Sequence, residues 1–224
     1  MAKERPFAVF DIDGTLIRWQ LYHAIADRLA KHGHVNPKAY QAVRDARMTW
    51  KRRTDSEAFK TYEQHLVRFY NQLLENLSVA NFMTAADAVF EEYKDQVYVY
   101  SRNLIKDLKQ NNYLLFALSG SQTEIVAKIA DYYGFDDYIG TTYERSGKFF
   151  TGELIHHLGK KDAVLKKLIK RHQTGLKGSI GVGDSASDTS MLELVETAIA
   201  FNPDQKLFTR ARQKAGGSSS SAKI

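Results

Sequence analysis

The 224-residue sequence contains no cysteine. This absence excludes a disulfide framework, a thiolate nucleophile and a thiolate metal site, and it suits a reducing compartment. Long apolar runs are missing too, since no stretch approaches the ~20 residues that cross a membrane. The opening MAKERPFAVF also lacks the apolar segment of a signal peptide. We therefore expect a cytoplasmic protein with no membrane partner.

Acidic residues are missing from the last part of the sequence, and this decides how the net charge is interpreted. The chain has a formal charge of +6, and four of these charges come from basic residues after Leu207, where no acid occurs, which leaves +2 for the remainder. So small a surplus disfavours a nucleic-acid partner. Lys51-Arg52-Arg53 is the one other basic run. It is typical of a solvated face, with contact to an anionic substrate as the alternative.

Hydrophobic spacing changes along the chain and indicates its organisation. The run PFAVF at 6–10 predicts a buried strand, and helical spacing over about 20–100 predicts a helical insert. Helices and strands then alternate. One helix is expected to end near 110, two are expected at 122–133 and 161–172, and a fourth is expected from about 186. Strands are expected at 113–119, 138–143, 178–184 and 197–201. This alternation predicts an α/β fold with a parallel sheet covered on both faces.

The same pattern predicts the division of the chain. Residues 1–17 and 98–206 are expected to form the core domain, and residues 18–97 a helical cap domain. Residues 207–224 are expected to form a basic tail, because they end in the Gly/Ser-rich AGGSSSSAKI, which is typical of a disordered segment or a linker.

Polar side chains follow three of the predicted strands. They are Asp11 and Asp13 in DIDGT, Ser119 in SGS, and Asp184 and Asp188 in GDSASD. In a parallel open sheet, ligands bind at the carboxyl ends of the strands, so these segments are expected to share one site. The carboxylates of Asp11, Asp13 and Asp184 are hard oxygen donors that suit Mg²⁺, and a cation would offset the repulsion between them.

These segments carry a resemblance to a known family. DIDGT at 11–15, Ser119-Gly120, a lysine at the start of a later helix and GDSASD at 183–188 resemble the four motifs of the haloacid dehalogenase superfamily of phosphohydrolases. The insert after the first motif and GFDDYIGTTYERSGKFFTGEL at 134–154 resemble its subfamily IB, the phosphoserine-phosphatase-like group. The resemblance implies a Rossmann-like, doubly wound core with an inserted all-helical cap of the C1 type.

The resemblance also implies roles for the first motif and the metal site. Asp11 would attack phosphorus and form an aspartyl-phosphate, and Asp13 would protonate the leaving oxygen and then activate water. Asp11, Asp13 and Asp184 would hold Mg²⁺. Asp188 would orient the water on the metal, or else the lysine.

Phosphate binding is implied for Ser119, the Gly120 N–H and one of two adjacent lysines. In the subgroup, a leucine follows this lysine by four positions. Lys161 has Leu165 at that spacing, whereas Lys160 has Val164, so we favour Lys161. Lys160 remains the alternative.

The expected function is Mg²⁺-dependent hydrolysis of a small phosphorylated metabolite, a phosphomonoester. The alternatives are a phosphotransferase or mutase of the same superfamily and, in a different class, a catalytically silent binding module. Phosphoserine phosphatases are expected to carry a glutamate nine residues after the nucleophile, where this chain has Gln20, with Arg18 close by. We therefore expect a substrate other than phosphoserine, unless Glu57 or Asp45 binds the ammonium group instead.

Overall fold

The computed structural model describes residues 4–52, 58–75, 77–156, 160–217 and 222–223. The chain divides into two compact units. We call the first the core unit (Met1–Gln20, Glu92–Thr141 and His157–Ile224) and the second the cap unit (Leu21–Glu91 and Thr142–His156). In the described part of the chain, none of the helices has the length and apolar character needed to traverse a bilayer.

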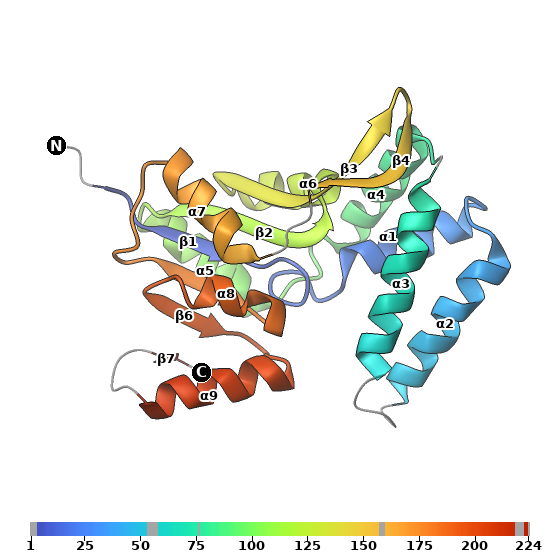
Figure 1. Cartoon of the computed structure of the whole chain (residues 1–224). Coiled ribbons are helices and arrows are strands. Elements are labelled where there is room, and N and C mark those ends of the chain that lie inside the picture. Colours follow the sequence, from blue (N-terminus) through green and yellow to red (C-terminus); the bar gives the residue numbers. More distant parts are fainter. Residues whose placement is uncertain (1–3, 53–57, 76, 157–159, 218–221, 224) are drawn as a thin grey trace. The chain divides into compact units, whose positions relative to one another are not determined.

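A parallel sheet lies at the centre of the core unit (Figure 1). All four residues of β1 (Phe7–Phe10) are buried, because β1 lies between β2 (Leu114–Gln122) and β5 (Ile180–Gly183) and pairs in parallel with both. The sheet continues from β2 to the first part of β3 (Asp137–Ser146), and from β5 to β6 (Thr197–Ala200) and β7 (Ala222–Lys223). The carboxyl ends of β1, β2 and β5 therefore lie next to one another.

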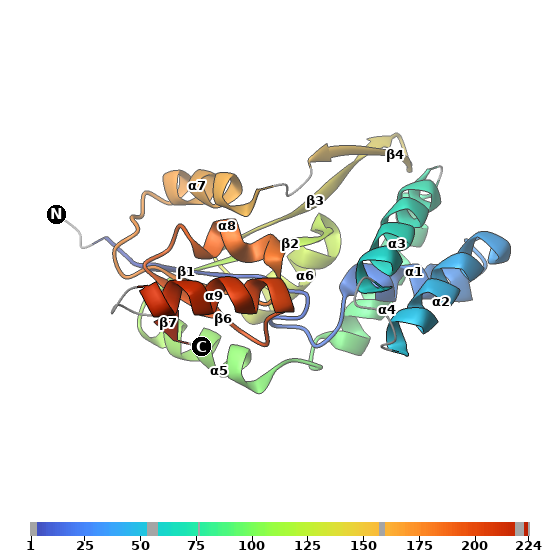
Figure 2. The same ribbon diagram turned by 60° about the horizontal axis from the view of Figure 1, so that its bottom comes forward.

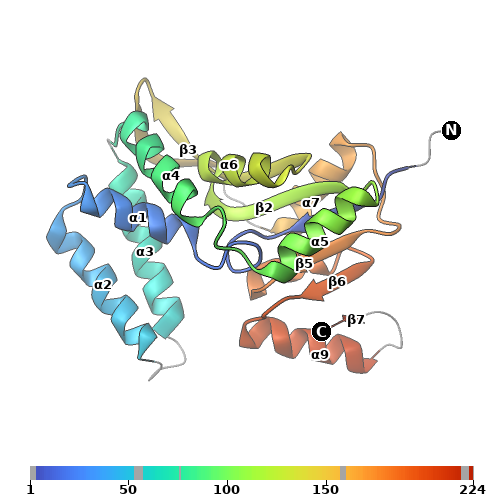
Figure 3. The same cartoon turned by 180° about the vertical axis from the view of Figure 1, so that it is seen from behind.

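Both faces of this sheet are covered, as its apolar strands require. One face presents Phe7, Val9 and Phe116 to α7 (Lys161–Arg171) and α8 (Thr189–Leu192). The other face is covered by α5 (Val99–Gln110) and α6 (Thr123–Tyr133), as Figures 2 and 3 show. The predicted α/β class, with a parallel sheet and helices on both faces, is confirmed.

The end of the chain differs from the predicted tail. A helix, α9, spans Gln205–Gly217. Its first turn is held by Leu207, which is buried and whose N–H donates to Asp204 Oδ1 at 2.7 Å. Further along α9, Arg210 and Lys214 form ion pairs with Glu193. Residues 207–217 of the predicted tail thus lie in a helix, and Glu193, which directly follows α8 (Thr189–Leu192), matches part of their basic charge. Residues 218–221 and 224 lie outside the described residues.

The first four helices belong to the cap unit and fit the predicted insert. They are α1 (Leu21–Lys31), α2 (Pro37–Lys51), α3 (Ala58–Leu74) and α4 (Val79–Tyr93), whose last two residues fall in the core unit. The start of α2 has clear local causes, because Pro37 occupies the first turn and Asn36 Oδ1 accepts the N–H of Lys38 at 2.9 Å. Side chains buried from successive turns, such as Ile25, Leu29 and Leu66, form the apolar interior of this unit.

A β-hairpin completes the cap unit and corrects the expected all-helical cap with limits at 18 and 97. The second part of β3 pairs antiparallel with β4 (Phe149–His156), which the sequence analysis did not predict. The connecting turn contains Gly147 at φ +59°, a backbone conformation that glycine adopts without strain. Phe150 of the hairpin is 1% exposed and its ring centroid lies 5.3 Å from that of Phe82, so the hairpin packs on the cap helices.

Candidate active site

The turn after β1 is positioned by its backbone. The N–H of Asp11 donates to the carbonyl oxygen of Val182 at 2.9 Å, which extends the β1–β5 pairing by one residue and fixes the start of the motif. Asp11 and Asp13 are both buried. Gly14 has φ +86°, and a Cβ there would lie 2.2 Å from Asp184 Oδ2. A glycine is therefore required both for the turn and for its close approach to Asp184.

Lys161, the first residue of α7, lies at the centre of the site. Its side chain is buried, and its Nζ donates to Asp11 Oδ1 and Asp188 Oδ1, each at 2.6 Å, and to the carbonyl oxygen of Leu118 at 3.1 Å. Lys160 is exposed. The structure thus places Lys161, the lysine favoured by helical spacing, at the strand ends. Burial alone would lower the pKa of Lys161, but Asp11 and Asp188 raise it above the ordinary value, so the ammonium stays charged.

The loop after β5 supplies two further carboxylates of the site, those of Asp184 and Asp188. Asp188 ends the short 3₁₀ helix η1 (Ala186–Asp188), and its Oδ2 accepts the N–H groups of Asp184 and Ser185, both at 3.0 Å. Asp184 Oδ1 accepts the hydroxyl of Thr15 at 3.2 Å. Asp188 therefore holds both the loop and Lys161. Thr15 was not among the predicted site residues, although its place in DIDGT next to two acids could have indicated it.

Asp11, Asp184 and Asp188 form a carboxylate cluster that could hold a metal ion. Each offers an oxygen, and these oxygens lie within 4.8 Å of one another. Burial raises the pKa of Asp11 well above its usual range, although Lys161 pulls it down. Burial and the neighbouring Asp188 raise the pKa of Asp184 to about 7. Burial is the main cause of both shifts, and repulsion between neighbouring carboxylates adds to it, which a divalent ion would relieve.

The carboxylate of Asp13 is not part of this cluster, and the expected ligand set Asp11, Asp13 and Asp184 remains a prediction. Ser119 donates its hydroxyl to Asp13 Oδ2 at 2.5 Å, and the N–H of Ser121 donates to Ser119 Oγ at 3.0 Å. Residues 11 and 13 of a regular strand would lie on one face, but β1 ends at Phe10 and the chain turns, so Asp11 and Asp13 meet different partners. The third carboxylate of the cluster is that of Asp188.

Ser119 and Gly120 are presented differently at the end of β2. Ser119 is fully buried, whereas Gly120 is exposed, and a Cβ on Gly120 would meet no atom within 4 Å. The backbone at Gly120 therefore faces open space. This is consistent with the approach of a ligand to its N–H, but phosphate binding by these two residues remains a prediction.

Arg18 and Gln20, the predicted specificity residues, follow the turn. Arg18 is exposed and its guanidinium lies 5.7 Å from the centre of the Tyr98 ring. Gln20 is partly buried and directly precedes α1. Asp45, an alternative partner for an ammonium group, accepts a hydrogen bond from Gln41 at 2.8 Å, and Glu57 lies outside the described residues. The roles of Arg18 and Gln20 remain predictions.

Comparison with known families assigns the chain to a class. The sequence model of the family described as haloacid dehalogenase-like hydrolase matches residues 8–193, a range that includes Asp11, Ser119, Lys161 and the GDSASD loop. The chain therefore belongs to the haloacid dehalogenase-like hydrolases, and the resemblance drawn from the four motifs is confirmed.

Two of the individual relatives that match this chain are named as phosphatases. Phosphoserine phosphatase SerB1 of Mycobacterium tuberculosis is 31% identical over 146 residues, 63% of this chain and 47% of the relative. A histidinol-phosphatase of Neisseria meningitidis is 24% identical over 92% of this chain and 95% of its own length. The chain spans about half the length of the mycobacterial relatives that it matches.

Solved structures agree on the fold. A Bordetella pertussis protein of unknown function has a TM-score of 0.75 at 21% identity, covering 95% of this chain and 97% of that one. An apo phosphoserine phosphatase has a TM-score of 0.67 at 20% identity, covering 92% of this chain and 91% of that one. The fold of this chain is thus that of phosphoserine-phosphatase-like members of the family.

Proposed function

We propose that this protein is a Mg²⁺-dependent phosphatase that hydrolyses small phosphomonoesters through an aspartyl-phosphate on Asp11. The observation that carries the proposal is the position of Lys161, buried between Asp11 and Asp188 at 2.6 Å from each. A buried cation next to a carboxylate nucleophile suits a phosphoryl group. The phosphoryl oxygens could accept the hydrogen bonds that Lys161 now donates to carboxylates. Family membership and the relatives named as phosphatases support the same reaction.

The residues of the carboxylate cluster fit a magnesium ion. Asp11, Asp184 and Asp188 offer hard oxygen donors within 4.8 Å of one another, and burial together with neighbouring carboxylates raises the pKa values of Asp11 and Asp184. When bound, Mg²⁺ would neutralise charge on the phosphoryl group and on the carboxylates that it approaches. We propose Asp11 and Asp184 as its carboxylate ligands, with Asp188 holding Lys161 and the loop.

The chain's own residues account for the bond changes. Asp11 attacks phosphorus, the bond from phosphorus to the leaving oxygen breaks, and the leaving oxygen takes a proton from Asp13. Water then attacks the aspartyl-phosphate, Asp13 takes the proton of that water, and the bond between phosphorus and Asp11 breaks. Asp13 lies outside the carboxylate cluster and accepts the Ser119 hydroxyl, an arrangement that suits proton transfer. Ser119, the Gly120 N–H and Lys161 would hold the phosphoryl oxygens.

The test is phosphate release from a panel of phosphorylated metabolites with Mg²⁺, repeated in excess chelator and without any acceptor other than water. We expect turnover that chelator abolishes and that added Mg²⁺ restores. Full activity in chelator would exclude the metal assignment. Phosphate transfer to a second metabolite with little release into water would identify a transferase, and no turnover of any phosphomonoester would favour a binding module.

For the substrate, we propose that phosphoserine is not preferred. Gln20 is neutral, and the neighbouring Arg18 is cationic, so this segment supplies no countercharge for an ammonium group. A charged hydrogen bond is worth roughly 1.5–3 kcal/mol, about ten- to a hundred-fold in discrimination. The measurement is kcat/KM for phosphoserine against phosphomonoesters without an amine. A tenfold or greater preference for phosphoserine over all of them would contradict the proposal.

A further inference from the structure

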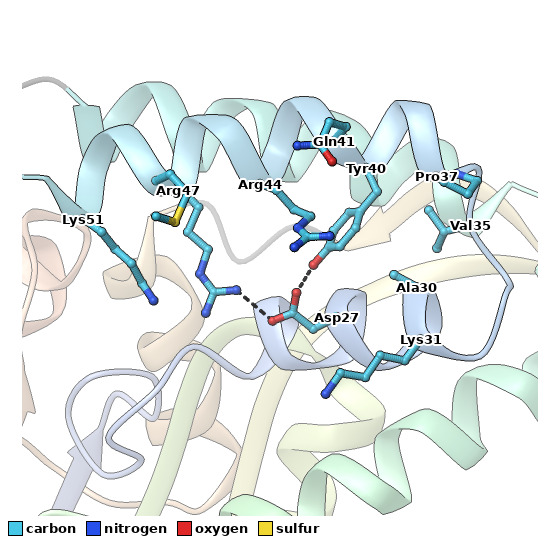
Figure 4. A pocket seen from close by; sticks show the side chains of 11 residues that line it. Asp27, Ala30, Lys31, Val35, Pro37, Tyr40, Gln41, Arg44, Arg47 and Lys51 are labelled. Atoms are coloured by element: carbon cyan, nitrogen blue, oxygen red, sulfur yellow. Dashed lines mark hydrogen bonds and ion pairs between the residues drawn. The ribbon is translucent and has the colours of Figure 1, made fainter.

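An open pocket of about 580 Å³ lies within the cap unit, between α1 and α2. Four cationic side chains line it, namely Lys31 from α1 and Arg44, Arg47 and Lys51 from α2, and the acidic residue in the lining is Asp27 (Figure 4). The pocket uses no residue of the core unit. Its chemistry can therefore be judged from the cap alone.

The charges in this pocket are not balanced. Asp27 is already engaged, because its Oδ1 accepts the hydroxyl of Tyr40 and its Oδ2 accepts Arg47 Nη1 at 2.9 Å. Within the described residues, no carboxylate forms an ion pair with Lys31, Arg44 or Lys51. Cations that share one pocket repel each other, and an anion that binds among them removes that repulsion. The pocket therefore favours an anionic ligand.

The spacing of the cations favours an extended anion. Arg44, Arg47 and Lys51 are three and four positions apart, so they follow one face of α2. At 1.5 Å per residue, Arg44 and Lys51 are separated by roughly 10 Å along the helix axis. One phosphate is too small to contact both ends of this row, whereas a chain of linked phosphates can, and guanidinium groups match phosphate oxygens in geometry.

Apolar groups line the α2 side of the other end of the pocket. Val35, Pro37 and the ring of Tyr40 line the end beyond Arg44, and Lys51 lies at the opposite end, as Figure 4 shows. A ligand that extends along the pocket would thus meet the cations of α2 at one end and an aromatic or aliphatic surface at the other, where Lys31 lines the opposite wall from α1. Pockets of this volume commonly hold small organic molecules.

We propose that this pocket binds an organic oligophosphate, two or more linked phosphates joined to an aromatic or apolar group, of the chemical class of nucleoside di- and triphosphates. The phosphates contact Arg44, Arg47 and Lys51, and the organic group lies against Tyr40 and Val35. The site is separate from the active site proposed in the core unit and does not depend on its chemistry. It also divides the basic run at 51–53, since Lys51 lines the pocket, Arg52 does not, and Arg53 lies outside the described residues.

The test is calorimetric titration of the full chain in chelator, with inorganic tripolyphosphate and with a non-hydrolysable adenosine triphosphate analogue as probes. The double variant Arg44→Ala/Lys51→Ala removes two pocket cations. Its matched control, Lys38→Ala/Arg52→Ala, removes two exposed cations of the same helix region that do not line the pocket. Circular dichroism checks that both variants keep the fold. The titrations are repeated at higher salt.

We expect tripolyphosphate to bind the natural sequence, the pocket variant to lose at least tenfold in affinity, and the control to stay within twofold. Added salt should weaken binding. The analogue should bind at least threefold more tightly than tripolyphosphate, and equal affinity would overturn the assignment of the apolar end. No binding, an unaffected pocket variant, or an equal loss in both variants would overturn the proposal, since an equal loss would mean attraction by overall charge alone.

Discussion

The core and cap units differ in whether their cations are paired with carboxylates of the protein. In the core unit, Lys161 is buried and two carboxylates of the protein bind it directly. In the cap unit, Arg44 and Lys51 are exposed and share a pocket in which the one acid in the lining, Asp27, is already bound to Arg47. A buried charge must be paired within the fold, whereas an exposed one can remain for a ligand. The cation of the core unit is thus matched by the protein itself, whereas the ligand proposed for the cap pocket would supply the negative charge that its lining lacks.

The largest expected effect is on the nucleophile. Asp11→Asn should lower kcat/KM for a phosphomonoester by at least about a thousandfold, or roughly 4 kcal/mol, because an amide cannot attack phosphorus. The fold should remain, since Asp188 still pairs with Lys161. Steady-state rates and thermal unfolding measure both effects. The control is Asp107→Asn, an exposed aspartate of α5, and retained activity in Asp11→Asn would exclude the covalent mechanism.

The next effect contrasts two adjacent lysines. Lys161→Met should lower the free energy of unfolding by about 3–5 kcal/mol, because it leaves Asp11 and Asp188 buried without their cation. Lys160→Met, at an exposed position, should change it by less than about 0.5 kcal/mol. Urea unfolding at pH 8 measures both. Equal losses in the two variants would mean that burial of Lys161 is not what sets its importance.

A smaller change is expected where the chain enters the cap. Gln20→Glu should raise kcat/KM for phosphoserine about tenfold relative to amine-free phosphomonoesters, because it supplies the missing countercharge for the ammonium group. Gln64→Glu, an exposed position of α3, is the control for added charge. If Gln20→Glu leaves the ratio unchanged, Gln20 does not face the substrate.

The smallest effect is the pH dependence of the metal-free protein. The folded protein raises the pKa of Asp184 to about 7, so the protonated form is favoured on folding. The resulting destabilisation is absent below about pH 4 and grows as pH rises through 7, by about 1.4 kcal/mol for each unit by which the pKa is raised. Asp184→Asn should flatten this dependence between pH 5 and 8. Urea unfolding in chelator checks it, and a stability that rises with pH in this range would contradict the prediction.

The sequence was sufficient to predict the strands of the core unit and the residues at their ends, because short local patterns indicate both. Asp11 and Asp184 are far apart in sequence, yet both follow buried strands, and parallel pairing alone brings such strand ends together. The hydrogen bond between Ser119 and Asp13 could not be predicted, because the direction of one side chain in a turn depends on tertiary contacts. The cap pocket was out of reach, because Lys31 meets the basic face of α2 only through the packing of two helices. Helix α9 was missed because its stabilising partner, Glu193, lies outside the segment.

The hairpin has a consequence for engineering. The cap unit is assembled from two separate stretches, Leu21–Glu91 and Thr142–His156, and Phe150 from the second stretch is buried against Phe82 from the first. A chimera that exchanges the cap between members of this family would therefore have to move both stretches together. Transplanting the helical insert alone would leave the donor's Phe82 without its aromatic neighbour and the recipient's hairpin without the surface for which it was selected.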